Sequence, residues 1–261
     1  MARVIDIHAH AFPANIAEKA AKALGEFYHF TVENEASCDA LAESAKAAGV
    51  EKVIIHSTAT VPRQVKDVNN FLKSCESELF IPFGSIHPNY DEIEKELDRI
   101  CMLGLKGLKL HPDFQEFDAD EKKAIRIYKA WEKTSLPLLI HGGDPVREYS
   151  LPQKIARIKD YCPDMVVIVA HLGGYRRLEE ADKYLIGKDF YIDTSSSLWY
   201  IPKQDVVSII RKHGADRVLF GTDYPVVKHT EELERFYNLG LTEEENEKIL
   251  YSNAKRLLRL K

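Results

Sequence analysis

Eight short apolar runs, separated by amphipathic stretches, limit the possible folds of this chain more than any other feature. The runs are rich in Val, Ile, Leu and Phe and are nearly continuous, as in strands buried on both faces. The stretches between them carry apolar residues on one side of a helix. Strands alternating with helices predict βαβ units and a parallel sheet. The runs are Val4–Ile7, Val53–His56, Phe80–Ile86, Leu105–Leu110, Leu136–His141, Met165–His171, Phe190–Thr194 and Val218–Thr222. The predicted helices between and after them are Tyr90–Leu103, Asp120–Lys133, Pro152–Tyr161, Arg176–Leu185, Gln204–Lys212, Thr230–Leu239 and Thr242–Leu260.

Eight such units predict a closed (β/α)8 TIM barrel, an α/β fold, rather than an open doubly wound sheet. The 261 residues are close to the roughly 250 that one barrel needs, so a single domain over 1–261 is expected. The longest connection is Ala11–Val50, and we expect part of it to fold over the mouth of the barrel.

Composition excludes several classes of protein. The net charge of −5 leaves no basic stripe for nucleic acid, and no run of 18 apolar residues predicts a membrane span. The first residues lack the basic and apolar regions of a signal peptide and read as the first strand. The four cysteines include no CxxC pair, so we interpret them as reduced thiols of a cytoplasmic protein.

Histidines gather where the predicted strands end, which is the functional face of a parallel barrel. Seven of the ten follow apolar runs, whereas His29, His213 and His229 fall in helices or connections and are expected on the surface. The seven are His8, His10, His56, His87, His111, His141 and His171.

The first run supplies a pair of histidines suited to a metal. His8 and His10 are two residues apart on a strand, so both point to the same face. Such pairs bind borderline divalent ions, and a histidine from the fifth strand with a carboxylate from the eighth would complete a mixed N/O site. Strands one and eight are neighbours only in a closed barrel, which places the first and last motifs side by side.

The ordered set resembles the metal-dependent amidohydrolase superfamily. It comprises His8 and His10, His141, His171 and Asp223, each after its strand. Further segments resemble the amidohydrolase-related branch, which includes aminocarboxymuconate semialdehyde decarboxylase. These are Gly107–Pro112, Ala170–Gly174, Gly221–Pro225 and Asn253–Leu258.

The resemblance implies a divalent metal, most often zinc, bound by His8, His10, His141 and Asp223. It also implies that His171 lies near the water on the metal and helps activate it. A bound divalent ion lowers the pKa of water from about 15.7 towards about 7, and His171 or Asp223 can then accept the proton. We expect one ion per chain.

Lys109 leaves the number of ions open. In binuclear members of the superfamily a lysine of the fourth strand is carbamylated and bridges two metals, whereas the decarboxylase-like branch is usually mononuclear. Lys109 and His111 share a face of their strand, so Lys109 could point into the barrel.

Other residues at the strand ends, Lys109 among them, are weaker candidates for binding substrate. His56, His87 and His111 could line the pocket or bond a neighbouring loop. Arg147, Tyr175, Arg176, Trp199 and Tyr200 could grip a carboxylate and a planar substrate, or simply pack in loops. Asp6 is expected to support the site from inside the barrel.

Three functions remain in competition. The first is a metal-dependent hydrolase of a small molecule, acting on an amide, cyclic amide, ester or lactone. The second is a nonoxidative decarboxylase of a conjugated or aromatic carboxylic acid. The third, a non-catalytic barrel, would be marked by loss of a metal ligand, and none is lost here. The resemblance also implies a homodimer, for which the residues show no interface.

Overall fold

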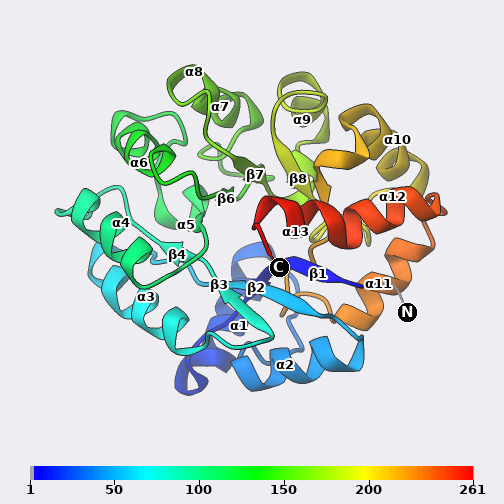
Figure 1. Cartoon of the computed structure of the whole chain (residues 1–261), viewed down its shortest axis with the longest axis horizontal. Coiled ribbons are helices and arrows are strands. Elements are labelled where there is room, and N and C mark those ends of the chain that lie inside the picture. The colour runs from blue at the N-terminus through cyan, green and yellow to red at the C-terminus, as the bar shows by residue number, and fades with distance from the viewer. Residues whose placement is uncertain (1–2, 261) are drawn as a thin grey trace.

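The computed structural model describes residues 3–260 and has the alternating strands and helices that the apolar runs predict (Figure 1). The strands are β1 (Ile5–His10), β2 (Lys52–His56), β3 (Phe80–Pro82), β4 (Gly84–Ser85), β5 (Leu108–Leu110), β6 (Leu138–Ile140), β7 (Val167–Val169), β8 (Tyr191–Asp193) and β9 (Val218–Leu219). The α-helices are α1 (Ala14–Tyr28), α2 (Cys38–Ala47), α3 (Val65–Ser74), α4 (Ile93–Met102), α5 (Pro112–Gln115), α6 (Lys122–Glu132), α7 (Pro152–Ala156), α8 (Ile158–Tyr161), α9 (Leu178–Tyr184), α10 (Lys203–His213), α11 (His229–Tyr237), α12 (Glu243–Glu247) and α13 (Asn253–Leu257). Short 3₁₀ turns lie at Pro62–Gln64, His171–Gly173 and Ala215–Arg217, and a π-helical stretch at Lys248–Ser252 joins α12 to α13.

The strands form a closed parallel barrel with eight positions, because β3 and β4 are two parts of one strand. β3 pairs with β2, and β4 pairs with β5, so the break at Phe83 does not open the wall. The Phe83 amide bonds the carbonyl oxygen of Ile55 at 2.9 Å across the break. The barrel closes where the Ile7 amide bonds the carbonyl oxygen of Phe220 at 2.9 Å. The predicted TIM barrel is therefore confirmed.

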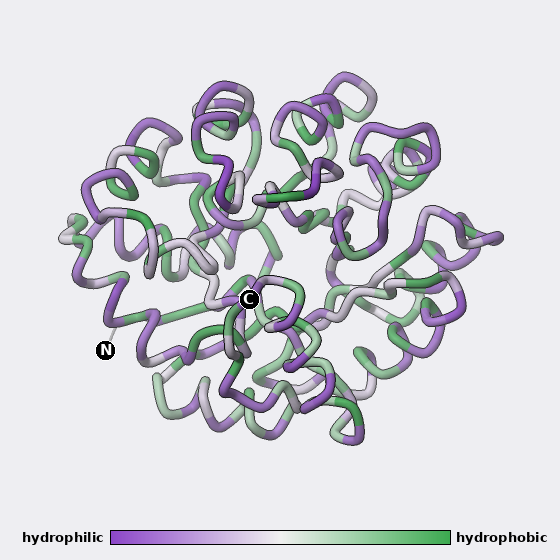
Figure 2. Tube along the Cα trace, turned by 180° about the vertical axis from the view of Figure 1, so that it is seen from behind, coloured by the Kyte–Doolittle hydropathy of each residue, from purple (hydrophilic) through white to green (hydrophobic). Residues whose placement is uncertain are grey.

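Apolar side chains fill two layers, one inside the barrel and one between the strands and the helices. In β6, for example, Leu139 packs inside with Ile168 and Phe83, whereas Leu138 and Ile140 pack outward under the helices. This is why the runs are apolar on both faces. Figure 2 shows hydrophobic segments towards the middle and hydrophilic segments on the outer helices.

A bulge in β1 turns both apolar side chains and histidines towards the barrel axis. The pairing with β2 shifts register between Asp6 and Ala9, so one extra residue lies on β1. Such a bulge re-aims side chains. Ile7 consequently joins the inner apolar cluster, while His8 and His10, further along, face the polar end of the barrel.

The two ends of the barrel are covered by different parts of the chain. Tyr28 at the end of α1 reaches His111 and His141 at the carboxyl ends of the strands, which fulfils the expectation for Ala11–Val50. At the opposite end Asn253 of α13 donates to the carbonyl oxygen of Val218 at 2.8 Å, at the start of β9. Within residues 3–260, no helix has both the length and the apolar character needed to cross a membrane.

Two histidines predicted on the surface are buried, whereas His29 is exposed as predicted. His213 Nε2 lies 2.9 Å from the carbonyl oxygen of Phe190, and its Nδ1 accepts from the Gly187 amide, so it ties the end of α10 to the start of β8. His229 lies under the barrel end beside Asp6. Both ring nitrogens of His213 are thus bonded, and His229 Nδ1 bonds the Ser44 hydroxyl at 2.9 Å. The predicted helix Pro152–Tyr161 divides into α7 and α8, and Thr242–Leu260 divides at the π-helical stretch.

Gly107 should tolerate no side chain, because a Cβ atom there would lie 2.4 to 2.6 Å from three ring carbons of the buried Phe83. We expect Gly107→Ala to lower the free energy of unfolding by about 1–3 kcal/mol, the usual cost of overpacking a core. Urea unfolding would measure it. Lys106→Ala, at the exposed neighbouring position, should stay within about 0.5 kcal/mol of wild type. Equal effects of the two substitutions would contradict the prediction.

Candidate metal centre and active site

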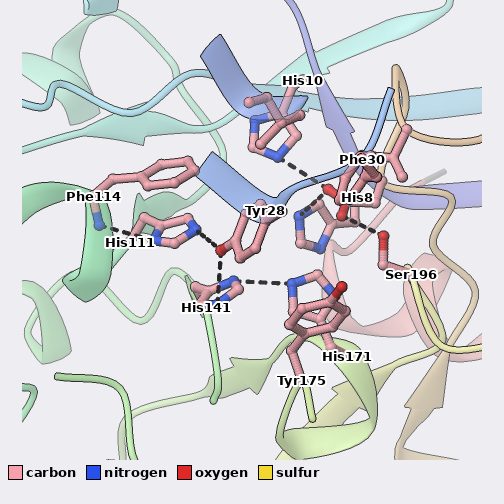
Figure 3. A pocket seen from close by; sticks show the side chains of 13 residues that line it. His8, His10, Tyr28, Phe30, His111, Phe114, His141, His171, Tyr175 and Ser196 are labelled. Carbon is pink, nitrogen blue, oxygen red and sulfur yellow. Dashed lines mark hydrogen bonds and ion pairs between the residues drawn. The ribbon is translucent and has the colours of Figure 1, made fainter. Parts of the chain in front are cut away.

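A small cavity lies at the carboxyl ends of the strands, where the sequence places its polar residues (Figure 3). Its wall combines imidazoles and one carboxylate with aromatic and aliphatic side chains. The lining residues are His8, His10, Leu24, Tyr28, Phe30, His111, Phe114, His141, His171, Tyr175, Ser196, Asp223 and Val226. Every histidine and carboxylate that the resemblance assigns to the metal or the water is among them.

The first and last motifs of the sequence meet in this cavity. Asp223 Oδ1 lies 3.1 Å from His10 Nε2 and 3.3 Å from His8 Nε2. Ser196 donates to the other carboxylate oxygen of Asp223 at 2.6 Å and fixes its orientation. Burial acts to raise the pKa of Asp223, but the surrounding histidines hold it well below the ordinary value. Asp223 is therefore an ionised oxygen donor.

Asp193, at the end of β8, orients His8. Its Oδ2 lies 2.9 Å from His8 Nδ1, and both groups are buried. Burial and then the charge of Lys109 lower the pKa of His8 to about 4, so the ring is neutral near pH 7. The hydrogen therefore sits on Nδ1, and the lone pair of Nε2 faces Asp223. A carboxylate behind a histidine is the usual support of a metal ligand.

Sequence reasoning missed Asp193, although a signal was present. It lies one residue before the end of the apolar run Phe190–Thr194, close to the position that His141 has in its own run. Asp193 Oδ1 also accepts from the backbone amides of His171 and Ser195, at 3.1 and 3.0 Å. Burial acts to raise its pKa, but His8 and the other donors lower it to about 2.

His141 and His171 face each other through one nitrogen of each ring, while the other nitrogen lies beside a carbonyl oxygen. His141 Nε2 lies 2.7 Å from the carbonyl oxygen of Gly143, and His171 Nδ1 lies 2.9 Å from that of Ser195. A ring nitrogen beside a carbonyl oxygen carries the hydrogen, so the opposite nitrogen of each ring has a lone pair. These two nitrogens, His141 Nδ1 and His171 Nε2, are 3.0 Å apart. A cation or a shared proton would relieve the repulsion between them.

The donor atoms fit a divalent ion. Two ligand atoms about 2.0–2.1 Å from a tetrahedral ion are about 3.4 Å from each other, close to the separations of Asp223 from His8 and His10. Imidazole nitrogens with a carboxylate oxygen are the donors that zinc and similar ions take. Two further groups have donor atoms within 4.8 Å of one another: His8, His10 and His56, and His111, Asp113 and His141.

Lys109 lies inside the barrel, as strand parity predicts. Its Nζ is 3.1 Å from His8 Nε2, beneath the lining of the cavity. Burial lowers the pKa of Lys109 to about 8.

Asp6 and its neighbours hold the backbone of the site in place. Asp6 Oδ1 accepts from the amides of His8 and Thr222 at 2.9 and 3.1 Å, and the Thr222 hydroxyl donates to Oδ2 at 2.6 Å. His229 Nε2 lies 3.1 Å from the same Oδ2. The expectation that Asp6 supports the site is thus met, and His229 is a supporting residue that sequence reasoning missed.

Three site residues adopt left-handed backbone conformations. His171, Ser196 and Asp223 have φ values of 60°, 47° and 63°. Such strain in non-glycine residues costs of order 1–3 kcal/mol each and gathers at functional sites. Here it aims three polar side chains at one point.

Tyr28 closes the cavity from above. Its hydroxyl lies 3.2 Å from His111 Nε2 and 3.3 Å from His141 Nε2. Burial raises the pKa of Tyr28 well above its ordinary value, so the phenol stays neutral. With Tyr28 and Phe30 in place the cavity holds about 20 Å³, room for about one water molecule. A substrate must therefore displace this cover.

Most predicted substrate-binding residues do not line the cavity; His111 and Tyr175 do. Arg147 donates to the carbonyl oxygen of Asp113 at 2.7 Å and stacks on Phe27. Arg176 is exposed and stacks on Tyr200, and Trp199 is 39% exposed. These contacts leave neither arginine directed at the site.

Two further histidines lie away from the cavity surface. His87 Nδ1 accepts from the Asn89 amide at 3.1 Å. Of its two expected roles, this is the bond to a neighbouring loop and not the lining of the pocket. His56 is fully buried against the rings of His8 and His10, and neither of its ring nitrogens has a hydrogen-bond partner among residues 3–260.

Known structures share this architecture. An uncharacterised TIM-barrel protein from Bordetella bronchiseptica is 23% identical, with a TM-score of 0.77 over 98% of each chain. A dihydroxybenzoic acid decarboxylase from Polaromonas sp., solved with bound manganese, is 16% identical, with a TM-score of 0.73 over 100% of this chain and 98% of its own. A "probable 2-pyrone-4,6-dicarboxylic acid hydrolase" from Acinetobacter baumannii is 13% identical, with a TM-score of 0.73 over 98% and 99%. At these identities the likeness establishes the fold.

Sequence comparison establishes the family. No curated protein matches the chain significantly. The profile of the family described as Amidohydrolase, however, matches residues 5–260, from the first strand to the last helix. The match includes both ends of the barrel and every donor in the cavity. The chain therefore belongs to the amidohydrolase family of metal-dependent enzymes.

Proposed function

We propose that this enzyme is a hydrolase that uses one divalent metal ion, zinc, to open an amide, cyclic amide, ester or lactone bond in a small molecule. The observation that carries the proposal is the position of His171, whose Nδ1 lies beside the carbonyl oxygen of Ser195 and whose Nε2 points at the donor atoms of the cavity. A base in this position suits the removal of a proton from water. Hydrolysis needs that step.

His8, His10, His141 and Asp223 would hold the ion. Their nitrogens and one carboxylate oxygen form a mixed donor set that favours zinc, although a structural relative was solved with manganese. The ion would polarise the substrate carbonyl and lower the pKa of water. A second ion would require Lys109 to carry a carbamate. We propose a single ion and no carbamate.

The residues of the chain would divide the remaining work. His171 Nε2 accepts the proton of the attacking water, and the carbonyl oxygen of Ser195 stabilises the Nδ1–H of the resulting imidazolium. The imidazolium then gives this proton to the leaving group, and the second oxygen of Asp223, held by Ser196, can relay it. Tyr28 and Phe30 exclude bulk water once the substrate is bound.

Decarboxylation is the second candidate, and the aromatic lining favours it. Tyr28, Phe30, Phe114 and Tyr175 could enclose a planar acid, and one structural relative is named a dihydroxybenzoic acid decarboxylase. Among the described residues, however, the lining includes no arginine or lysine to grip a carboxylate. Hydrolysis of an uncharged group makes no such demand. The homodimer and the cytoplasmic location stay predictions.

A substrate panel separates the two reactions. We expect the zinc-loaded enzyme to hydrolyse members of a set of small lactones, aryl esters and cyclic amides, followed by acid release in a pH-stat. We expect no carbon dioxide from hydroxybenzoic acids measured in parallel. Release of carbon dioxide without any hydrolysis would overturn the proposal in favour of decarboxylation.

Removal of the proposed base should slow the reaction without loss of metal. We expect His171→Gln to lower kcat by about 10²–10⁴-fold, the usual contribution of general base catalysis. Zinc content, measured by elemental analysis, should stay near one ion per chain. His29→Gln, at an exposed histidine, is the matched control and should keep wild-type kcat. Wild-type turnover by His171→Gln would contradict the role.

The support of His8 by Asp193 should appear in metal affinity. We expect Asp193→Asn to weaken zinc binding by about 10–100-fold, because the amide no longer fixes the imidazole as a carboxylate does. Competition with a chelator on metal-free protein measures this directly. Asp205→Asn, at an exposed acid of α10, should leave the affinity unchanged. An unchanged affinity in Asp193→Asn would contradict the supporting role of Asp193 behind His8.

A further inference from the structure

Two cysteines far apart in the sequence meet outside the active site. Cys38 is the first residue of α2, and Cys75 directly follows α3. Their Sγ atoms are 2.8 Å apart, about 0.8 Å more than the length of a disulfide bond. Both side chains are partly buried rather than enclosed, so a small reagent can reach them.

The helix ends hold the two sulfurs in place. The Ser37 hydroxyl accepts from the Ala40 amide and caps the start of α2. The Cys75 amide bonds the carbonyl oxygens of Phe71 and Leu72 at the end of α3. Both cysteines pack against the same apolar cluster between the strands and helices. The contact therefore comes from two anchored backbones and needs only side-chain movement to close.

We propose that Cys38 and Cys75 form a reversible intramolecular disulfide. Neither residue lines the metal cavity, so the pair is separate from the catalytic machinery. The nearest sequence signal, a CxxC pair, is absent. For that reason the sequence predicts four independent thiols, and only the folded chain brings Cys38 and Cys75 together.

Cys75 is the thiol prepared to react first. The Cys38 thiol donates a hydrogen bond to Cys75, which lowers the pKa of Cys75 and raises that of Cys38. The thiolate is the nucleophile in disulfide exchange.

A small-molecule disulfide such as oxidised glutathione can serve as the oxidant of the two thiols. The Cys75 thiolate attacks one sulfur, forms a mixed disulfide and releases one glutathione thiolate, which takes up a proton. Cys38 then loses its proton and attacks the Cys75 sulfur, expelling the second glutathione thiolate. Two protein thiols are oxidised, and one disulfide is reduced to two thiols.

The Cys38–Cys75 disulfide would link the segment that covers the active site to the wall of the barrel. Cys38 follows the segment that joins α1 to α2, and this segment carries Phe30 to the cavity. Cys75 precedes β3. The cross-link would close the chain between positions 38 and 75, which restricts the unfolded state and raises thermal stability.

Thiol trapping of the full-length protein tests the proposal. The protein is incubated with oxidised glutathione and denatured in urea with N-ethylmaleimide. Its mass is then measured by mass spectrometry. We expect the number of alkylated thiols to fall from four to two, with a peptide joining Cys38 to Cys75. Dithiothreitol should restore four. The oxidised form should have a higher Tm than the reduced form.

Variants identify the pair and its order of reaction. Cys38→Ala should stop the cross-link, leave glutathione on Cys75 and abolish the rise in Tm. Cys75→Ala should also stop the cross-link and serves if the first variant does not fold. Cys101→Ser is the matched control and should keep the Cys38–Cys75 bond. Four reactive thiols after oxidation, cross-links between chains, or a glutathione adduct that persists on wild-type Cys75 would overturn the proposal.

Discussion

Closure of the barrel between β1 and the chain after β9 is the constraint on which the site depends. The Asp223 amide donates to the carbonyl oxygen of His8 at 2.8 Å, and the His10 amide donates to that of Tyr224 at 2.7 Å. These bonds alternate along both segments, so they fix His8 and His10 opposite Asp223. The proposed metal ligands, more than 200 positions apart, are thereby held at ligand spacing by backbone bonds. Any change that opens this seam would disturb the fold and the site together.

The sequence predicts the features that follow from strand periodicity. Strands, barrel and inward-facing polar ends all arise from apolar runs buried on both faces, so reading where each run ends locates His141, His171 and Asp223. Asp193 obeys the same rule, because it lies at the end of β8, the seventh strand of the barrel. That residue was predictable, unlike those placed by long connections.

Residues placed by tertiary packing could not be predicted from the sequence. Tyr28 lies on an amphipathic helix, and its periodicity shows which side is buried but not that its end reaches His141. His229 begins α11, one residue before the predicted helix, so it lay outside the apolar stripe and was assigned to the surface. The contacts of the two arginines could not be predicted for a related reason. Arg147 and Arg176 follow the right strands, but their loops turn them towards local carbonyl and aromatic partners.

The charges at the strand ends explain why so many histidines can be buried together. Burial and then the charge of Lys109 hold the pKa of His8 at about 4, and burial lowers that of His10, so both rings stay neutral near pH 7. Asp193 and Asp223 are ionised, while Lys109, with a pKa of about 8, supplies at most one positive charge. The buried cluster therefore carries excess negative charge, which is costly unless paired. Protonation of His8 or His10 does not supply the balance at neutral pH, because burial lowers the pKa of both. A divalent cation can, and it would use the same lone pairs that the neutral rings direct into the cavity.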